Sequence, residues 1–126
     1  MGYYSEVAIC MAFEDEAKRD AFWDLISLRK DEVGEVMRNK CAKDDRMPWI
    51  TYHDSSIKWY ETHPTRQAFE NDGCLFDLVI ECGGAYRLMR LGEEADDYET
   101  NEDAADGGKV ESPWDAFYVV RHIEWG

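Results

Sequence analysis

The sequence predicts an α+β protein, with an antiparallel-rich sheet of about five strands and two main helices on one face of it. Two observations support this. Apolar residues alternate with a period of two in several short segments, as in half-buried strands, and they recur at helical spacing in longer ones. The length of 126 residues suits one core, so residues 1–126 are expected to form a single domain. The predicted order is β-α-β-β-α-β-β.

Segment 3–13 is the first predicted strand. Its strongly apolar face holds every second residue: Val7, Ile9, Met11 and Phe13. Segment 14–28 predicts a helix, because acids in a first turn suit the positive end of the helix dipole and apolar residues then recur at helical spacing. Val33, Val36 and Met37 continue an apolar face toward Cys41, and Gly34 together with the RKDE segment at 29–32 indicates a break or a second short helix.

Two aromatic-rich segments in the middle of the chain predict a β-hairpin. Residues 49–53 and 57–61 have strand-like composition. The residues between them, Asp54, Ser55 and Ser56, are of types that favour turns.

Segment 65–82 predicts the second main helix, with Pro64 in its first turn. Residues 74–82 alone would also fit a strand. The helix is favoured because the glycines at 83–84 supply the left-handed position at which helices end.

The C-terminal part predicts two further strands, at 85–91 and 114–125, joined by a long acidic loop at about 93–113. A loop of this length is either functional or mobile. The first six elements match the ferredoxin-like split β-α-β order only loosely.

Charge excludes some partners. The chain has 28 acidic and 14 basic residues, for a net charge of −14, and residues 47–126 carry −11 of it. Such a protein is repelled by phosphate backbones, so direct nucleic-acid binding is disfavoured. Either the charge keeps the protein dispersed in solution, or it meets a basic surface on a partner, where complementary charges steer the encounter.

The densest acidic run extends from Glu93 to Asp106, with eight acids and no basic residue. Carboxylates pair with arginine as phosphates do, so this run can compete for an Arg-rich groove. An equally weighted alternative is a solvating loop that protects a sheet edge. The candidate partner-binding residues are Glu93, Glu94, Asp96, Asp97, Tyr98, Glu99, Glu102 and Asp103.

No catalytic or metal motif is present in the sequence. The three histidines, His53, His63 and His122, lack zinc-site spacing, and the acidic run fails the EF-hand pattern. No serine has a nucleophile-elbow setting. We therefore expect no enzyme activity, no cofactor and no metal. The absence of a signal peptide and of a membrane span predicts a cytoplasmic protein with free cysteines.

Several short pieces together resemble small acidic proteins of bacteriophages and prophages. They are residues 2–9, residues 57–60 followed by Pro64, residues 87–93 followed by Asp96 and Asp97, and residues 121–124. Some proteins of this class inhibit host defence, including anti-CRISPR proteins that occupy the DNA-binding surface of a CRISPR effector. The resemblance implies no catalytic residues.

The leading hypothesis is a non-enzymatic phage accessory protein in the bacterial cytoplasm. It would present its acidic surface to the basic, nucleic-acid-binding site of a host protein or ribonucleoprotein. The alternative is a structural or homodimeric module, joined through an exposed strand and aromatics such as Trp49 and Tyr52, in which the acidic loop only solvates.

Overall fold

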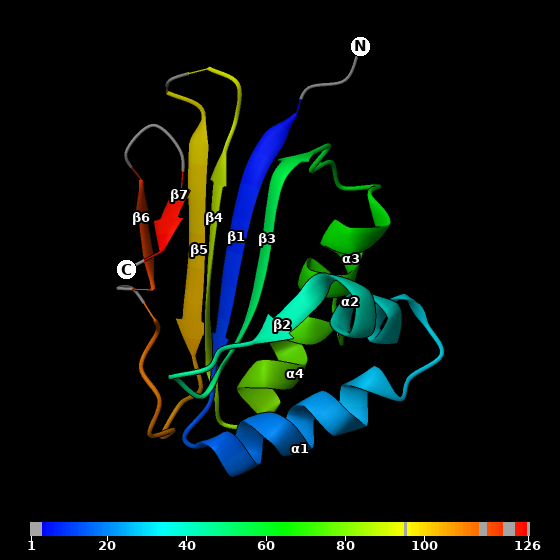
Figure 1. The fold of residues 1–126 in the computed structure, drawn as a ribbon, viewed down its shortest axis with the longest axis vertical. Helices are drawn as coiled ribbons and strands as arrows, with labels where there is room; N and C mark the ends of the chain where they lie inside the picture. The colour runs from blue at the N-terminus through cyan, green and yellow to red at the C-terminus, as the bar shows by residue number, and fades with distance from the viewer. Residues whose placement is uncertain (1–3, 95, 114–115, 120–122, 126) are drawn as a thin grey trace.

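The computed structural model describes residues 4–94, 96–113, 116–119 and 123–125. An antiparallel sheet forms one layer and the helices gather on one side of it (Figure 1). This confirms the predicted α+β class with a five-stranded antiparallel sheet. The sheet strands are β1 (Ser5–Ala12), β2 (Cys41–Lys43), β3 (Trp49–Ile57), β4 (Ala85–Leu91) and β5 (Tyr98–Ala104).

The spatial order of the strands is β2-β3-β1-β4-β5. Strand β3 lies between β2 and β1, and β1 lies between β3 and β4, so each helical connection joins strands that are not neighbours. This interleaving is the split β-α-β arrangement that the sequence indicated loosely. Strand β5 is added beyond β4, where it forms the edge of the sheet.

The sequence predicted two main helices. In the described part of the chain four helices connect the strands: α1 (Glu16–Ser27), α2 (Glu32–Lys40), α3 (Pro64–Glu70) and α4 (Leu75–Glu81). Asp15 and Asp31 cap α1 and α2 by accepting hydrogen bonds from the backbone N–H groups of Lys18 and Gly34. Residues 28–31 separate the two helices, so the predicted second short helix is confirmed, but Gly34 lies inside α2 and does not mark the break.

The single helix predicted over 65–82 is wrong. The chain leaves the helical path after Glu70, and Gly73 has a positive φ of 75°, which an L-residue side chain disfavours. A new helix then starts at Leu75, so residues 75–81 are helical and not a strand. The predicted end is confirmed, because Gly83 has φ 80° just past α4.

The hairpin predicted at 49–61 is also wrong, since β3 runs without a turn from Trp49 to Ile57. Its register against β1 shifts where Ser5 pairs with Ile57 and Val7 with Asp54. Asp54 Oδ1 accepts a hydrogen bond from Ser56 N at 2.9 Å. The turn-forming residues are therefore absorbed as a bulge within the strand.

The main core lies between the sheet and the helices. The fully buried side chains there include Ile9 and Leu88 from the sheet and Phe69 and Val79 from the helices. A smaller apolar cluster on the opposite face of the sheet joins Ala8, Cys10 and Met89 to Ala116 and Ile123. The C-terminal segment therefore covers part of that face.

The single strand predicted over 114–125 is wrong in its described parts. Residues 117–119 and 123–125 form two antiparallel strands, β6 (Phe117–Val119) and β7 (Ile123–Trp125), in a sheet of their own. Residues 114–115 and 120–122 of the prediction lie outside the described residues. Ile123 N donates to Glu6 Oε1 at 3.0 Å, which fastens β7 to β1.

The acidic loop predicted at about 93–113 is wrong for its central third. Residues 98–104 form β5, which pairs with β4 in an unbroken register from Ala85↔Ala104 to Leu91↔Tyr98. Of the described residues in this region, 92–94, 96–97 and 105–113 lie outside helices and strands. Within the described part of the chain, none of the helices is long and apolar enough to cross a membrane.

Candidate protein-binding edge of the sheet

Strand β5 is the outermost strand on the β4 side, and its side chains remain open to solvent. All six residues from Tyr98 to Asp103 are exposed, and Tyr98 is 63% exposed. A strand usually buries one face, so exposure of both faces is what makes β5 available to a partner. We call Tyr98–Asp103 together with the preceding residues 93, 94, 96 and 97 the acidic edge.

The two faces of β5 follow from its register. Arg90 of β4 pairs with Val7 of β1 on one side and with Glu99 of β5 on the other, and Val7 belongs to the core beneath the helices. Glu99 and Asp103 therefore point to the helix side, because side chains alternate with a period of two. Glu102 points to the opposite side, so both faces of the strand carry carboxylates.

Arg90 holds the turn to the strand. Its Nη2 contacts Asp97 Oδ1 at 2.8 Å, and its Nε donates to Glu99 Oε1, also at 2.8 Å. Its Nη1 donates to Ser5 Oγ at 3.2 Å. Only 15% of the Arg90 side chain is exposed. The hydrogen bonds to Asp97, followed by those to Glu99, raise the pKa of the Arg90 guanidinium, so it remains charged.

Other acids of the edge are held individually. Glu93 Oε1 accepts from Tyr4 N at 2.9 Å, and Glu102 Oε2 accepts from the Ser112 hydroxyl at 2.5 Å. Asp103 Oδ1 accepts from Ala104 N at 2.8 Å. These contacts fix carboxylates that still face solvent. A fixed carboxylate loses less conformational entropy when a basic partner arrives.

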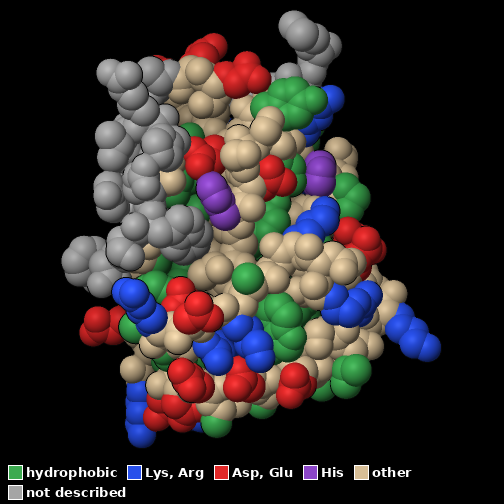
Figure 2. Space-filling model, viewed as in Figure 1, with side chains coloured by type: hydrophobic (Ala, Val, Ile, Leu, Met, Phe, Trp, Pro, Cys, Tyr) green, Lys and Arg blue, Asp and Glu red, His purple; other side chains and the backbone are tan. Residues whose placement is uncertain are grey.

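The structure thus brings all eight predicted residues onto one hairpin: Glu93, Glu94, Asp96, Asp97, Tyr98, Glu99, Glu102 and Asp103. Seven of them are exposed and Asp97 is half-buried. Figure 2 shows acidic side chains at the end of the molecule where the β4–β5 turn lies in Figure 1.

Sequence reasoning missed Arg90 and the pocket beside it. This pocket has a volume of about 250 Å³ and is lined by Ser5, Trp59, Tyr60, Arg66, Arg90, Asp97 and Glu99. In this pocket Arg66 Nε donates to Glu70 Oε2 at 2.6 Å, and Arg66 Nη1 donates to the Trp59 carbonyl oxygen at 3.0 Å. The signal in the sequence was the position of Arg90, the last cation before the acidic run, two residues before Gly92.

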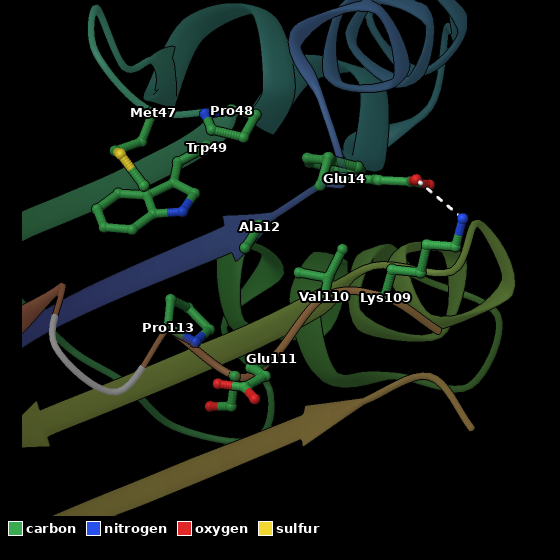
Figure 3. Close-up of a pocket in the computed structure, with 11 residues that line it drawn as sticks. Ala12, Glu14, Met47, Pro48, Trp49, Lys109, Val110, Glu111 and Pro113 are labelled. Atoms are coloured by element: carbon green, nitrogen blue, oxygen red, sulfur yellow. Dashed lines mark ion pairs between the residues drawn. The ribbon is translucent and has the colours of Figure 1, made fainter. Parts of the chain in front are cut away.

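A larger groove, with a volume of about 410 Å³, lies at the end of the sheet opposite the β4–β5 turn. Figure 3 shows Met47, Pro48 and Trp49 on one wall and Val110 and Pro113 on the other, with Ala12 between them. Glu14 and Lys109 close one end, with 3.7 Å between Glu14 Oε1 and Lys109 Nζ. Trp49 therefore lines a groove.

The homodimer alternative fails for one of its two named aromatics. Tyr52 is only 2% exposed and packs on Phe69 and Trp59 in the main core, so it is not available to a second copy.

The histidines have separate structural roles. His53 Nε2 lies 2.7 Å from Glu6 Oε2 on the sheet, and His63 Nδ1 accepts from Thr65 N at 3.1 Å as the cap of α3. His122 lies outside the described residues. Among the residues that are described, no group of three or more His, Cys, Asp or Glu is arranged to hold a metal ion.

Cys41, Cys74 and Cys82 are free thiols, and Cys10 is buried in the sheet. Comparison of the chain with protein-family models, with curated proteins and with solved structures finds no match. The proposed function therefore rests on the geometry of the acidic edge.

Proposed function

We propose that this chain is a non-enzymatic binding protein that presents its acidic edge to the basic, nucleic-acid-binding surface of a protein partner. The observation that carries the proposal is that an exposed edge strand displays carboxylates on both of its faces, at Glu99, Glu102 and Asp103. Arginine and lysine side chains that ordinarily meet phosphates would meet these carboxylates instead.

The charge balance of the edge supports this proposal. Residues 93–106 hold eight acids, whereas β4 supplies two cations: Arg90, which pairs with Asp97 and Glu99, and Arg87, which lies opposite Glu102 in the register. The surplus negative charge lies on a surface whose backbone is fixed by the sheet. Fixed charges speed association with a surface of opposite sign and favour it over neutral surfaces.

The biological setting in this proposal follows the resemblance to small acidic phage proteins. The protein would act in the cytoplasm of a bacterial host, where it would block a defence complex or another nucleic-acid-handling complex, such as a CRISPR effector. Occupation of the basic site excludes the nucleic acid, so inhibition needs no chemistry.

The test is capture of partners from a bacterial lysate at low and high salt, with identification by mass spectrometry. The edge variant is Glu99→Gln/Glu102→Gln/Asp103→Asn. Its matched control, Glu61→Gln/Asp72→Asn/Glu81→Gln, removes the same charge from exposed positions near the helices. We expect the wild type and the control to retain a basic nucleic-acid-binding protein that the edge variant loses. Equal capture by all three would contradict the proposal.

A further inference from the structure

Among the residues that the structure describes, the outer edge of β5 is not paired with another strand. Strand β5 pairs with β4 on one side, and no described strand pairs with its other side. Its register with β4 has no bulge over seven pairs, and its residues include neither proline nor lysine. Those are the usual devices by which proteins keep an edge strand from accepting another strand. In the described part of the chain, acidic side chains on both faces of β5 are the protective feature that remains.

The register shows which backbone groups are unpaired. Gly92 N donates to Asp97 O at 2.7 Å before β5, and Ala105 N donates to Gly84 O at 3.1 Å after it. In an antiparallel ladder, every second residue directs its N–H and C=O to the neighbouring strand. Glu99, Asn101 and Asp103 therefore bond to β4, while the backbone groups of Tyr98, Thr100 and Glu102 point outward.

The charges select the occupant. A second copy of β5 would place acids opposite acids, which is destabilising across strands. An extended segment rich in lysine or arginine would instead place cations beside Glu99 and Asp103 on one face and beside Glu102 on the other. Strand addition of this kind draws affinity from the backbone and specificity from alternate side chains.

We propose that β5 accepts an extended Lys/Arg-rich segment of the partner as a sixth strand, hydrogen-bonded to the backbone of Tyr98, Thr100 and Glu102. This inference rests on the proposed function and specifies how the acidic edge would bind. It predicts that recognition depends on outward backbone groups as well as on charge.

The variant Thr100→Pro tests this dependence. Proline removes the outward N–H of residue 100 but leaves the pairing with β4 and every charge in place. The probe is a short, capped peptide in which Lys and Val alternate, measured by isothermal titration calorimetry at low salt. We expect Thr100→Pro to weaken binding by about tenfold or more, and Thr100→Ala to leave it within about twofold.

A second measurement keeps the proposal testable if Thr100→Pro unfolds. The same peptide, N-methylated at alternate residues, keeps its charge and loses the donors that would face the edge. Two such peptides are compared, one methylated at the odd-numbered residues and one at the even-numbered residues. We expect one of the two to bind the wild-type protein at least about tenfold more weakly than the unmethylated peptide does. Full binding by both methylated peptides would overturn strand addition.

The outcomes separate the inference from the proposed function. Binding that is lost in the edge variant but unchanged in a folded Thr100→Pro would overturn strand addition and leave charge recognition intact. If the peptide does not bind and the edge variant still captures the lysate partner, both proposals fail. Self-association abolished by Thr100→Pro in sedimentation experiments would overturn the inference in favour of a second copy.

Discussion

At the scale of single residues, Arg90 connects three parts of the chain. Its guanidinium contacts Asp97 in the turn, Glu99 in β5 and Ser5 in β1. A partly buried cation therefore contacts two carboxylates of the acidic edge. Removal of Arg90 would lower the free energy of unfolding mainly because hydrogen bonds to charged groups are lost, and less because a surface charge is lost.

We predict that Arg90→Gln lowers the free energy of unfolding by about 1–2 kcal/mol, because Asp97 and Glu99 lose their shared cation. Urea unfolding measures this change. The control is Lys30→Gln, which removes the same charge from an exposed position. An equally small effect of the two substitutions would show that Arg90 does not hold the turn.

Cys41 provides a pH-dependent test. Burial raises the pKa of the Cys41 thiol to about 12, compared with about 8.5 in an unfolded chain. The stabilising contribution of the neutral thiol is therefore complete below about pH 8.5 and is lost as the pH rises toward 12.

We predict that Cys41→Ala flattens the alkaline fall in the free energy of unfolding between about pH 8.5 and pH 11. The control, Cys82→Ala, removes an exposed thiol and should change the slope less. Denaturant unfolding at a series of pH values gives the slopes. Parallel slopes for the wild type and Cys41→Ala would contradict this account.

At the scale of elements, strands and helices that bury one face were predictable. Strand β1, helix α1 and strand β4 were predicted because apolar periodicity records burial. Strand β5 was not, because none of its residues from 98 to 103 is buried and its strand conformation comes from backbone pairing with β4. The candidate site was found through its charge, while its placement on a hairpin required the structure.

Two other errors have local causes. The turn-forming residues 54–56 became a bulge because Ile57 is buried against the main core and continues the pairing with Ser5. Gly73 separated α3 from α4 through its positive φ, which helical spacing of the apolar residues on both sides does not reveal.

Gly34 gives an element-scale prediction. It lies inside the first turn of α2, where alanine would ordinarily stabilise a helix by about 1 kcal/mol. A Cβ at this position would lie 2.1 Å from the Arg29 carbonyl oxygen. We therefore predict that Gly34→Ala destabilises the protein by roughly 1–3 kcal/mol.

The matched control is Asn39→Ala, at an exposed position of the same helix. It should be neutral or slightly stabilising in thermal unfolding, because alanine has the higher helix propensity. A stabilising Gly34→Ala would mean that α2 does not approach Arg29 as closely as described.

At the scale of the whole molecule, the charge is distributed unevenly along the chain. Residues 1–46, which include α1 and α2, carry only −3, while residues 47–126 carry −11. The helices cover one side of the sheet, and the acidic edge is left on the strand added beyond the split β-α-β arrangement. Binding of a partner to β5 would therefore leave the packing of the core between the sheet and the helices unchanged.

The central claim is that the acidic edge competes with nucleic acid for a basic site on a protein. The most direct measurement is displacement of labelled nucleic acid from the captured partner by the wild type, the edge variant and the matched control. We predict displacement by the wild type and the control, weakening with salt, and little by the edge variant. Equal displacement by the edge variant would contradict the claim.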